Sequence, residues 1–143
     1  MMDMTTSPVT NVLQPLQRDV QRLLGRCLLR LQQYERLMKA IVAHHEISGP
    51  AHSLEAIRTA RIEDAATKTL GTLIGQLFGS YVVTDGNGGE ERDDDLPGDV
   101  ISFRTRVQLS LSAQDYAKTQ ADLKDLVSLR NTLVHHFIDQ HDL

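Results

Sequence analysis

Apolar residues recur every three or four positions over the first third of the chain, from Leu13 to about His45. This spacing places them on one face of a helix of about thirty residues, roughly 45 Å long at about 1.5 Å per residue. Pro15 is tolerated only in the first turn, so the helix is expected to begin close to it and to end at Ser48-Gly49-Pro50. The apolar positions are Leu13, Leu16, Val20, Leu23, Leu24, Cys27, Leu31, Tyr34, Met38, Ile41 and Val42.

A second helical pattern follows, and Ser53 is suited to cap its start. Apolar residues continue at helical spacing to about Gly79. Gly71, Gly75 and Gly79 are four residues apart and would form one ridge, where the missing side chains allow a neighbouring helix to approach closely. The apolar stretch is short and follows several charged residues, so a membrane-spanning helix is not expected.

The segment 81–99 is rich in Gly and Asp and is expected to be a mobile, solvated loop. From Ile101 to Leu111 apolar and polar residues alternate, which is typical of an extended segment with one buried face. A single strand needs a partner, either within the long loop or on a second copy. We expect this segment to cover the helices.

Ser112 and Asp115 resemble a helix-capping pattern, and a long helical pattern begins there. It continues to about Ile138, either as one helix or as two with a break before Arg130. The sequence therefore predicts a single all-α domain over residues 1–143, with three or four helices and one extended insert. The first ten residues are expected to be a flexible N-terminus.

Composition narrows the classes of function. Cys27 is the only cysteine, which excludes an intrachain disulfide and a four-cysteine metal site within one copy, and which favours a reducing cytoplasmic compartment. The N-terminus lacks the pattern of a secretory signal. The net charge is -4, but the segment EERDDD from Glu90 to Asp95 contributes all of it, so the rest of the chain is neutral and compatible with a polyanionic partner.

The sequence contains no GxxxxGK[ST], GxGxxG, GxSxG or HExxH pattern, so kinase, dehydrogenase, serine hydrolase and zinc protease functions are not indicated. His44, His45, Glu46 and His52 are close in sequence. Adjacent histidines diverge by about 100° on a helix, so a solvated cluster is favoured over a metal site. No metal or cofactor is expected.

The stretch LVSLRNTLVHHFIDQ, residues 126–140, places polar groups among apolar ones. Helical spacing puts Arg130 on or beside the apolar face. A buried guanidinium without a partner is strongly destabilising, so Arg130 needs a carboxylate, a carbonyl, a bound anion or an interface.

This stretch resembles the motif of HEPN domains. In that family an arginine, usually followed by a polar residue, precedes a histidine on the last helix of a four-helix bundle, with four to six residues between them. Here Arg130 is followed by Asn131, and four residues separate it from His135. The resemblance implies a HEPN-like bundle and extends more loosely to the long N-terminal helices and to Thr69–Gly75.

Many HEPN proteins are endoribonucleases of toxin-antitoxin, phage-defence or RNA-processing systems, and the residues suit that chemistry without a metal. Histidine titrates near neutrality and can transfer protons, so His135 would serve as acid or base. Arg130 would stabilise the charged phosphate, because its guanidinium is permanently charged and presents several donors. The products would carry a 2',3'-cyclic phosphate.

One straight helix does not direct both groups to one point, because five residues leave Arg130 and His135 about 140° apart. We therefore expect a homodimer with a composite site, as the resemblance also implies. Asn131 is expected to orient His135, and His136 is a weaker candidate for substrate contact or proton transfer. Some HEPN toxins carry, at the position of Phe137, a tyrosine that a nucleotidyltransferase partner modifies. Phe137 has no hydroxyl group, so regulation by that modification is not expected, and an antitoxin that acts in another way stays open.

Arg18, Arg22, Arg26 and Arg30 recur every four residues and form a ridge that could follow an RNA backbone. The competing interpretation is a solvated helix face. For Arg130, Asn131 and His135 the competing interpretation is a hydrogen-bonded polar group that fixes packing or dimer register. A catalytically inactive HEPN-like domain that binds a nucleotide or a partner protein is the alternative function.

Overall fold

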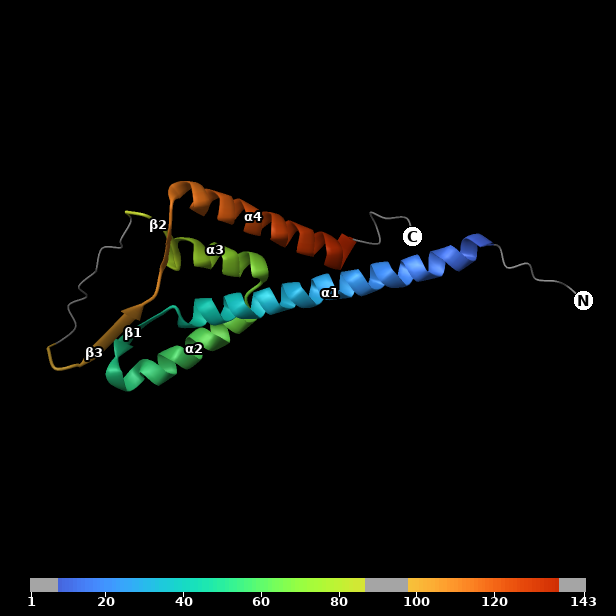
Figure 1. Cartoon of the computed structure of the whole chain (residues 1–143). Helices are drawn as coiled ribbons and strands as arrows, with labels where there is room; N and C mark the ends of the chain where they lie inside the picture. Colours follow the sequence, from blue (N-terminus) through green and yellow to red (C-terminus); the bar gives the residue numbers. More distant parts are fainter. Residues whose placement is uncertain (1–7, 87–97, 137–143) are drawn as a thin grey trace, which may run out of the picture. The chain divides into compact units, whose positions relative to one another are not determined.

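The structure, a computed structural model, describes residues 8–86 and 98–136 (Figure 1). By its internal contacts the chain divides into two units, Met1–Tyr34 and Glu35–Leu143. Helix α1, Pro8–His44, contributes residues to both. The acidic segment from Glu90 to Asp95 and the apolar residues Phe137 and Ile138 lie outside the described residues.

In the first unit the described element is the N-terminal part of α1, which begins at Pro8 rather than close to Pro15. Proline suits the first helical position, because the amide hydrogen that it lacks would have no partner there. Pro15 is accommodated inside the helix, where its ring removes one backbone hydrogen bond. Of the first ten residues, those from Pro8 onward are therefore helical.

The second unit holds the end of α1 and three further helices. These are α2, Leu54–Thr67, which follows the short 3-10 helix η1, Ala51–Ser53; α3, Leu70–Ser80; and α4, Ala113–Asn131. The single helix expected from Ser53 to Gly79 is thus wrong. Lys68 is extended, with ψ of 144°, and ends α2. Thr69 starts a new helix, because its side chain accepts a hydrogen bond from the amide of Thr72.

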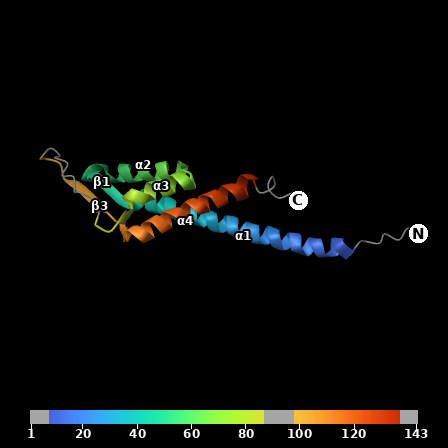
Figure 2. The ribbon, with the colours of Figure 1, turned by 90° about the horizontal axis from the view of Figure 1, so that it is seen from above.

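Two small sheets connect the helices. Strand β1, Glu46–Pro50, pairs antiparallel with β3, Ser102–Arg106, with Glu46 opposite Arg106 (Figures 1 and 2). Strand β2, Val82–Thr84, pairs parallel with β4, Leu109–Leu111. The extended segment therefore finds its partners within the chain.

Two expectations about these strands are wrong. The start of the supposed loop 81–99 is ordered, since Val82 is only 7% exposed. The alternating segment buries no continuous face: Ile101 and Val107 are 81% and 60% exposed, and only Leu111 at its end packs against the core cluster. Strands β1 and β2 form backbone hydrogen bonds with β3 and β4, so this segment keeps its extended structure without a continuous buried face.

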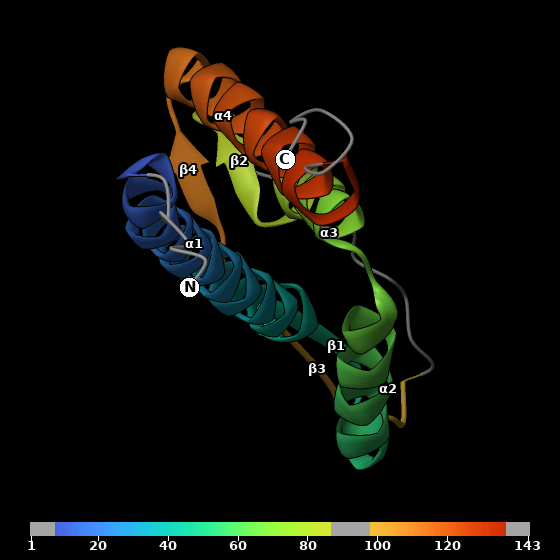
Figure 3. The ribbon, with the colours of Figure 1, turned by 90° about the vertical axis from the view of Figure 1, so that its right-hand side faces the viewer.

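The main core forms between α3, β2 and α4, which lie side by side in the second unit (Figure 3). Phe78 packs edge to face against Tyr116, with ring centroids 5.1 Å apart. Gly71 lies against α4, because a Cβ there would be 3.6 Å from Val127. Gly75 has no such neighbour, and Gly79 has a φ of +95° that favours glycine. The buried residues of this cluster are Leu70, Ile74, Phe78 and Val82.

The described chain is predominantly helical, which confirms the all-α expectation at this coarse level. Over the same residues, no helix combines the length and the apolar character that crossing a bilayer requires.

Replacement of Leu70 tests this core. Leu70 is 2% exposed, so Leu70→Ala is expected to lower the free energy of unfolding by about 2–5 kcal/mol through lost burial and a residual cavity. Leu129, which is 53% exposed on α4, is the matched control. Leu129→Ala is expected to change the free energy of unfolding by less than about 0.5 kcal/mol. Urea denaturation measures both, and equal effects would contradict the assigned core.

Candidate functional site

The helix that carries the predicted catalytic residues begins with a well-formed cap. Ser112 Oγ accepts a hydrogen bond from the amide of Asp115 at 3.1 Å and donates one to the Asp115 carboxylate at 2.9 Å. This confirms the predicted start. Helix α4 then continues through Arg130 to Asn131 without a break. The two-helix alternative with a break before Arg130 is therefore excluded.

The helical winding changes immediately after Asn131. Residues Thr132–His136 form a π-helical turn, η2. A π turn closes its hydrogen bonds over five residues instead of four, so residues five apart lie about one turn apart. Arg130 and His135 are separated by this interval, and most of it lies within η2. The turn therefore reduces the divergence of about 140° that a straight α-helix would impose.

Arg130 is half-buried at the end of α4. Its Nη1 donates a hydrogen bond to Asn131 Oδ1 at 3.1 Å. Within the described ranges, no carboxylate lies at ion-pair distance from its guanidinium. The need for a polar partner, predicted from the sequence, is thus met in part by the adjacent amide. Several guanidinium donors are left to face solvent or a bound anion.

His135 is exposed, and it has an interaction within the chain. Arg130 and Asn131 end α4, and His135 lies in the π turn that follows, so the three residues occupy successive turns of one helical segment. His136 belongs to the same turn, but its side chain lies outside the described part. The role of Asn131 toward His135 stays a prediction, whereas its contact with Arg130 is a property of the structure.

The four arginines of the predicted RNA-binding ridge lie in the first unit, and all four are exposed. Arg22 pairs with Asp19 at 3.3 Å, one turn away on the same helix. Both side chains of that pair are more than 60% exposed, so their attraction is weak. The ridge therefore presents cationic groups to solvent, as either interpretation of it requires.

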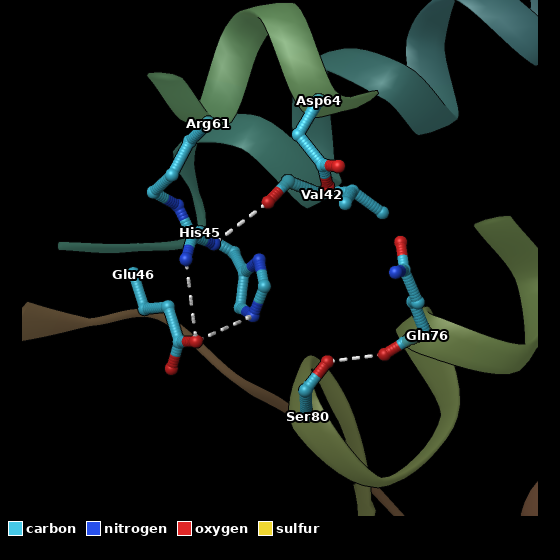
Figure 4. Close-up of a pocket in the computed structure, with 7 residues that line it drawn as sticks. All are labelled: Val42, His45, Glu46, Arg61, Asp64, Gln76 and Ser80. Carbon is cyan, nitrogen blue, oxygen red and sulfur yellow. Dashed lines mark hydrogen bonds and ion pairs between the residues drawn. The ribbon is translucent and has the colours of Figure 1, made fainter. Parts of the chain in front are cut away.

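Sequence reasoning missed a second polar cluster, which surrounds Glu46 in the second unit (Figure 4). The Glu46 carboxylate lies 2.9 Å from Arg106 Nε and 3.6 Å from Arg61 Nη1. Arg61 also donates to the carbonyls of Val42 at 2.8 Å and Ala43 at 3.1 Å. These carbonyls end α1 and have no partner within the helix, so Arg61 caps that helix.

His45 completes this cluster from the end of α1. Its Nδ1 lies 3.0 Å from the carbonyl of Ile41, and because a carbonyl only accepts, Nδ1 carries the proton. Its Nε2 is buried without a hydrogen-bond partner among the described residues and lies 4.0 Å from Glu46 Oε1. The expectation of a solvated histidine cluster is wrong for His45, which is 7% exposed, and holds for His44 and His52.

A cavity of about 260 Å³ adjoins this cluster, and neither Arg130 nor His135 lines it. It is small for a ligand site, since such pockets usually occupy about 300–1,000 Å³. Across the described ranges, no group of three His, Cys, Asp or Glu side chains is arranged to hold a metal ion. The lining residues are Val42, His45, Glu46, Arg61, Asp64, Gln76 and Ser80 (Figure 4).

No family model, curated protein or solved structure matches this chain.

Replacement of Arg61 tests its capping role. We expect Arg61→Met to lower the free energy of unfolding by about 1.5–3 kcal/mol, because the charge-assisted hydrogen bonds to two helix-end carbonyls and the Glu46 ion pair are lost together. Arg58 lies one turn earlier on α2, and its side chain is 56% exposed. Its single ion pair, with Glu55, is long at 3.9 Å. Arg58→Met is therefore the matched control, with a change below about 0.5 kcal/mol. Similar denaturation midpoints for the two variants would contradict the cap.

Proposed function

We propose that this chain is a metal-independent endoribonuclease of the HEPN type that acts as a toxin or effector, with Arg130 and His135 as its catalytic pair. The observation that supports the proposal is the π turn at Thr132–His136. The turn begins two residues after Arg130 and contains His135, and both of these side chains reach solvent. π turns occur frequently at functional sites, because they turn side chains in directions that α-helical winding does not.

The proposed reaction is an internal transesterification of RNA. The 2'-oxygen forms a bond to the adjacent phosphorus, the bond from phosphorus to the 5'-oxygen breaks, and a 2',3'-cyclic phosphate remains. His135 would accept the 2'-hydroxyl proton or donate a proton to the leaving 5'-oxygen. Arg130 would donate hydrogen bonds to the phosphate oxygens as negative charge develops on them.

Asn131 has a positioning role in this proposal. Its Oδ1 accepts from Arg130 Nη1, which restrains the guanidinium and leaves its other donors for a phosphate. His136 is the alternate group for proton transfer, since it is adjacent to His135 in the same turn.

The proposal includes a HEPN-like four-helix bundle and a homodimer in which two copies of the C-terminal segment form one site. The π turn weakens the geometric reason for a composite site but does not remove the need for a second proton-transfer group, which a second His135 would supply. The natural setting would be the cytoplasm, where RNA is present and Cys27 stays reduced. An antitoxin would restrain the activity, by a mechanism other than modification of a tyrosine at position 137, which is Phe137 here.

RNA cleavage in EDTA tests the catalytic pair. We expect the wild-type protein to cleave cellular RNA, and Arg130→Ala and His135→Ala each to lower the rate by about 100-fold or more. Arg130→Lys is expected to restore only part of the activity, because an ammonium lacks the planar fork of a guanidinium. End-group analysis of the products is expected to find 2',3'-cyclic phosphate.

Arg58→Ala and His44→Ala are the matched controls, since both residues are exposed and neither is adjacent to η2. Circular dichroism establishes that every variant is folded. Full cleavage by the folded Arg130→Ala or His135→Ala protein would overturn the assignment. A folded wild type that cleaves none of several RNA pools would favour the binding or scaffold function.

RNA affinity tests the arginine ridge separately from catalysis. Arg22→Glu combined with Arg26→Glu is expected to weaken binding of single-stranded RNA at low salt and to flatten its salt dependence, because fewer counterions are released. Arg58→Glu combined with Lys124→Glu changes the net charge by the same amount at exposed positions of the second unit and is the control. Equal affinities for the two double variants, measured by fluorescence anisotropy, would remove the ridge from the proposal.

A further inference from the structure

A buried acceptor without a donor lies on the wall of the cavity beside Glu46. The His45 side chain is only 4% exposed, and its Nε2 has no hydrogen-bond partner among the described residues. Because Nδ1 carries the proton that binds the carbonyl of Ile41, Nε2 has a lone pair and can only accept. Folded proteins rarely keep a buried acceptor in this state unless a donor binds it. This atom therefore calls for a bound donor.

The cavity that His45 lines is formed by side chains of the second unit. The His45 ring extends into the space between Asp64 of α2 and the side chains of Gln76 and Ser80 of α3 (Figure 4). The volume of about 260 Å³ is several times the ~30 Å³ that one water occupies in the liquid. Although small for a drug-sized ligand, the cavity has room for a ligand of about ten non-hydrogen atoms.

The position of Glu46 specifies the kind of donor that fits. Its Oε1 lies 4.0 Å from His45 Nε2, and both atoms are acceptors. Arg106 donates to the other oxygen, Oε2. A single donor atom about 2.9 Å from both Nε2 and Oε1 would have them about 90° apart. That angle suits a nitrogen with two or three hydrogens, which gives one to each acceptor. A hydroxyl group has one hydrogen and satisfies only one of them.

The charges on the cavity wall favour a cationic donor. Two carboxylates, Glu46 and Asp64, line the cavity together with one cation, Arg61. Arg61 directs Nε and Nη2 at the carbonyls of Ala43 and Val42, where its charge offsets the negative end of the α1 dipole. The wall therefore keeps an excess of negative charge, which attracts an ammonium group.

Asp64 provides a second carboxylate in the same cavity. Within the described residues its ion pair is with Lys68, four residues later, at 3.2 Å, and the Asp64 side chain is 61% exposed. An exposed pair of this kind is weak, so a second cation can take the place of the lysine at little cost. A ligand with two ammonium groups can thus contact His45 and Glu46 with one end and Asp64 with the other.

We propose that this cavity binds a short aliphatic diamine. One ammonium group donates to His45 Nε2 and Glu46 Oε1, and the other pairs with Asp64. The alkyl chain between them lies beside Val42, the apolar residue of the lining. The inference does not depend on RNA cleavage, because neither Arg130 nor His135 lines the cavity.

Isothermal titration calorimetry with 1,4-diaminobutane, butylamine and 1,4-butanediol tests the site in the wild-type protein. We expect the diamine to bind with a Kd of about 0.1–1 mM, within the range that six non-hydrogen atoms can supply. Butylamine is expected to bind at least about tenfold more weakly, because it lacks the second ammonium group, and the uncharged diol is expected not to bind. Water also carries two hydrogens, so a folded wild type that binds neither amine would overturn the proposal and leave water as the donor.

His45→Asn tests the buried acceptor. The asparagine amide keeps a donor near the carbonyl of Ile41 but offers no acceptor at the position of Nε2. We expect this variant to bind both amines at least about tenfold more weakly. His44→Asn, at the exposed neighbouring position, is the matched control and is expected to bind as the wild type does. Wild-type affinity in folded His45→Asn would overturn the proposal.

Asp64→Asn tests the second ammonium contact. It is expected to lower the affinity for the diamine to that for butylamine and to leave butylamine binding unchanged. The matched control is Asp122→Asn on α4, because Asp122 is also 61% exposed and pairs with Lys118 four residues away. Equal losses in the two variants would overturn the proposal.

Two further comparisons keep the test decisive. If circular dichroism finds His45→Asn unfolded, the comparison of Asp64→Asn with Asp122→Asn decides, since both side chains are exposed. His135→Ala is expected to bind the diamine as the wild type does. Failure of this site is therefore distinct from failure of the nuclease proposal.

Discussion

The carboxylate of Glu46 is the point on which the second unit depends. It lies two residues beyond the end of α1, accepts a hydrogen bond from Arg106 of β3 and forms an ion pair with Arg61 of α2. The same Arg61 caps the carbonyls of Val42 and Ala43. This ion cluster thus caps the end of α1, links α2 to it through Arg61 and links β3 to β1 through Arg106. Because Glu46 is only 29% exposed, its two cations offset the desolvation that burial of the carboxylate requires.

The C-terminal segment combines regular and irregular winding for a physical reason. Ser112 and Asp115 cap the start of α4, and packing of Tyr116 and Val127 against the core fixes its path. Beyond this packed region the winding loosens into the π turn. A π turn has poorer intrinsic stability than an α turn, so it is usually kept where it redirects side chains. Here the redirected positions include His135.

Helix α1 carries side chains of two kinds in its first-unit part. Arg18, Arg22 and Arg26 are exposed cations, and Leu16 and Leu23 are exposed apolar residues, with Arg26 only about 60° from Leu23 around the helix.

Much of the local structure was determined by the sequence alone. The three-four spacing predicted α1, the Ser112 cap predicted the start of α4, and the alternation after Ile101 predicted extended structure, because each depends on interactions between residues near in sequence. The positions of Arg130 and His135 near the end of the last helix were predictable for the same reason. Only the tertiary structure decided the pairing of β1 with β3, the division at Lys68, the π turn and the cluster around Glu46. The pairing, the division and the cluster depend on residues that are far apart in the chain, so long-range packing rather than local spacing selects them. The π turn replaces one allowed local geometry by another, which spacing along the sequence does not distinguish.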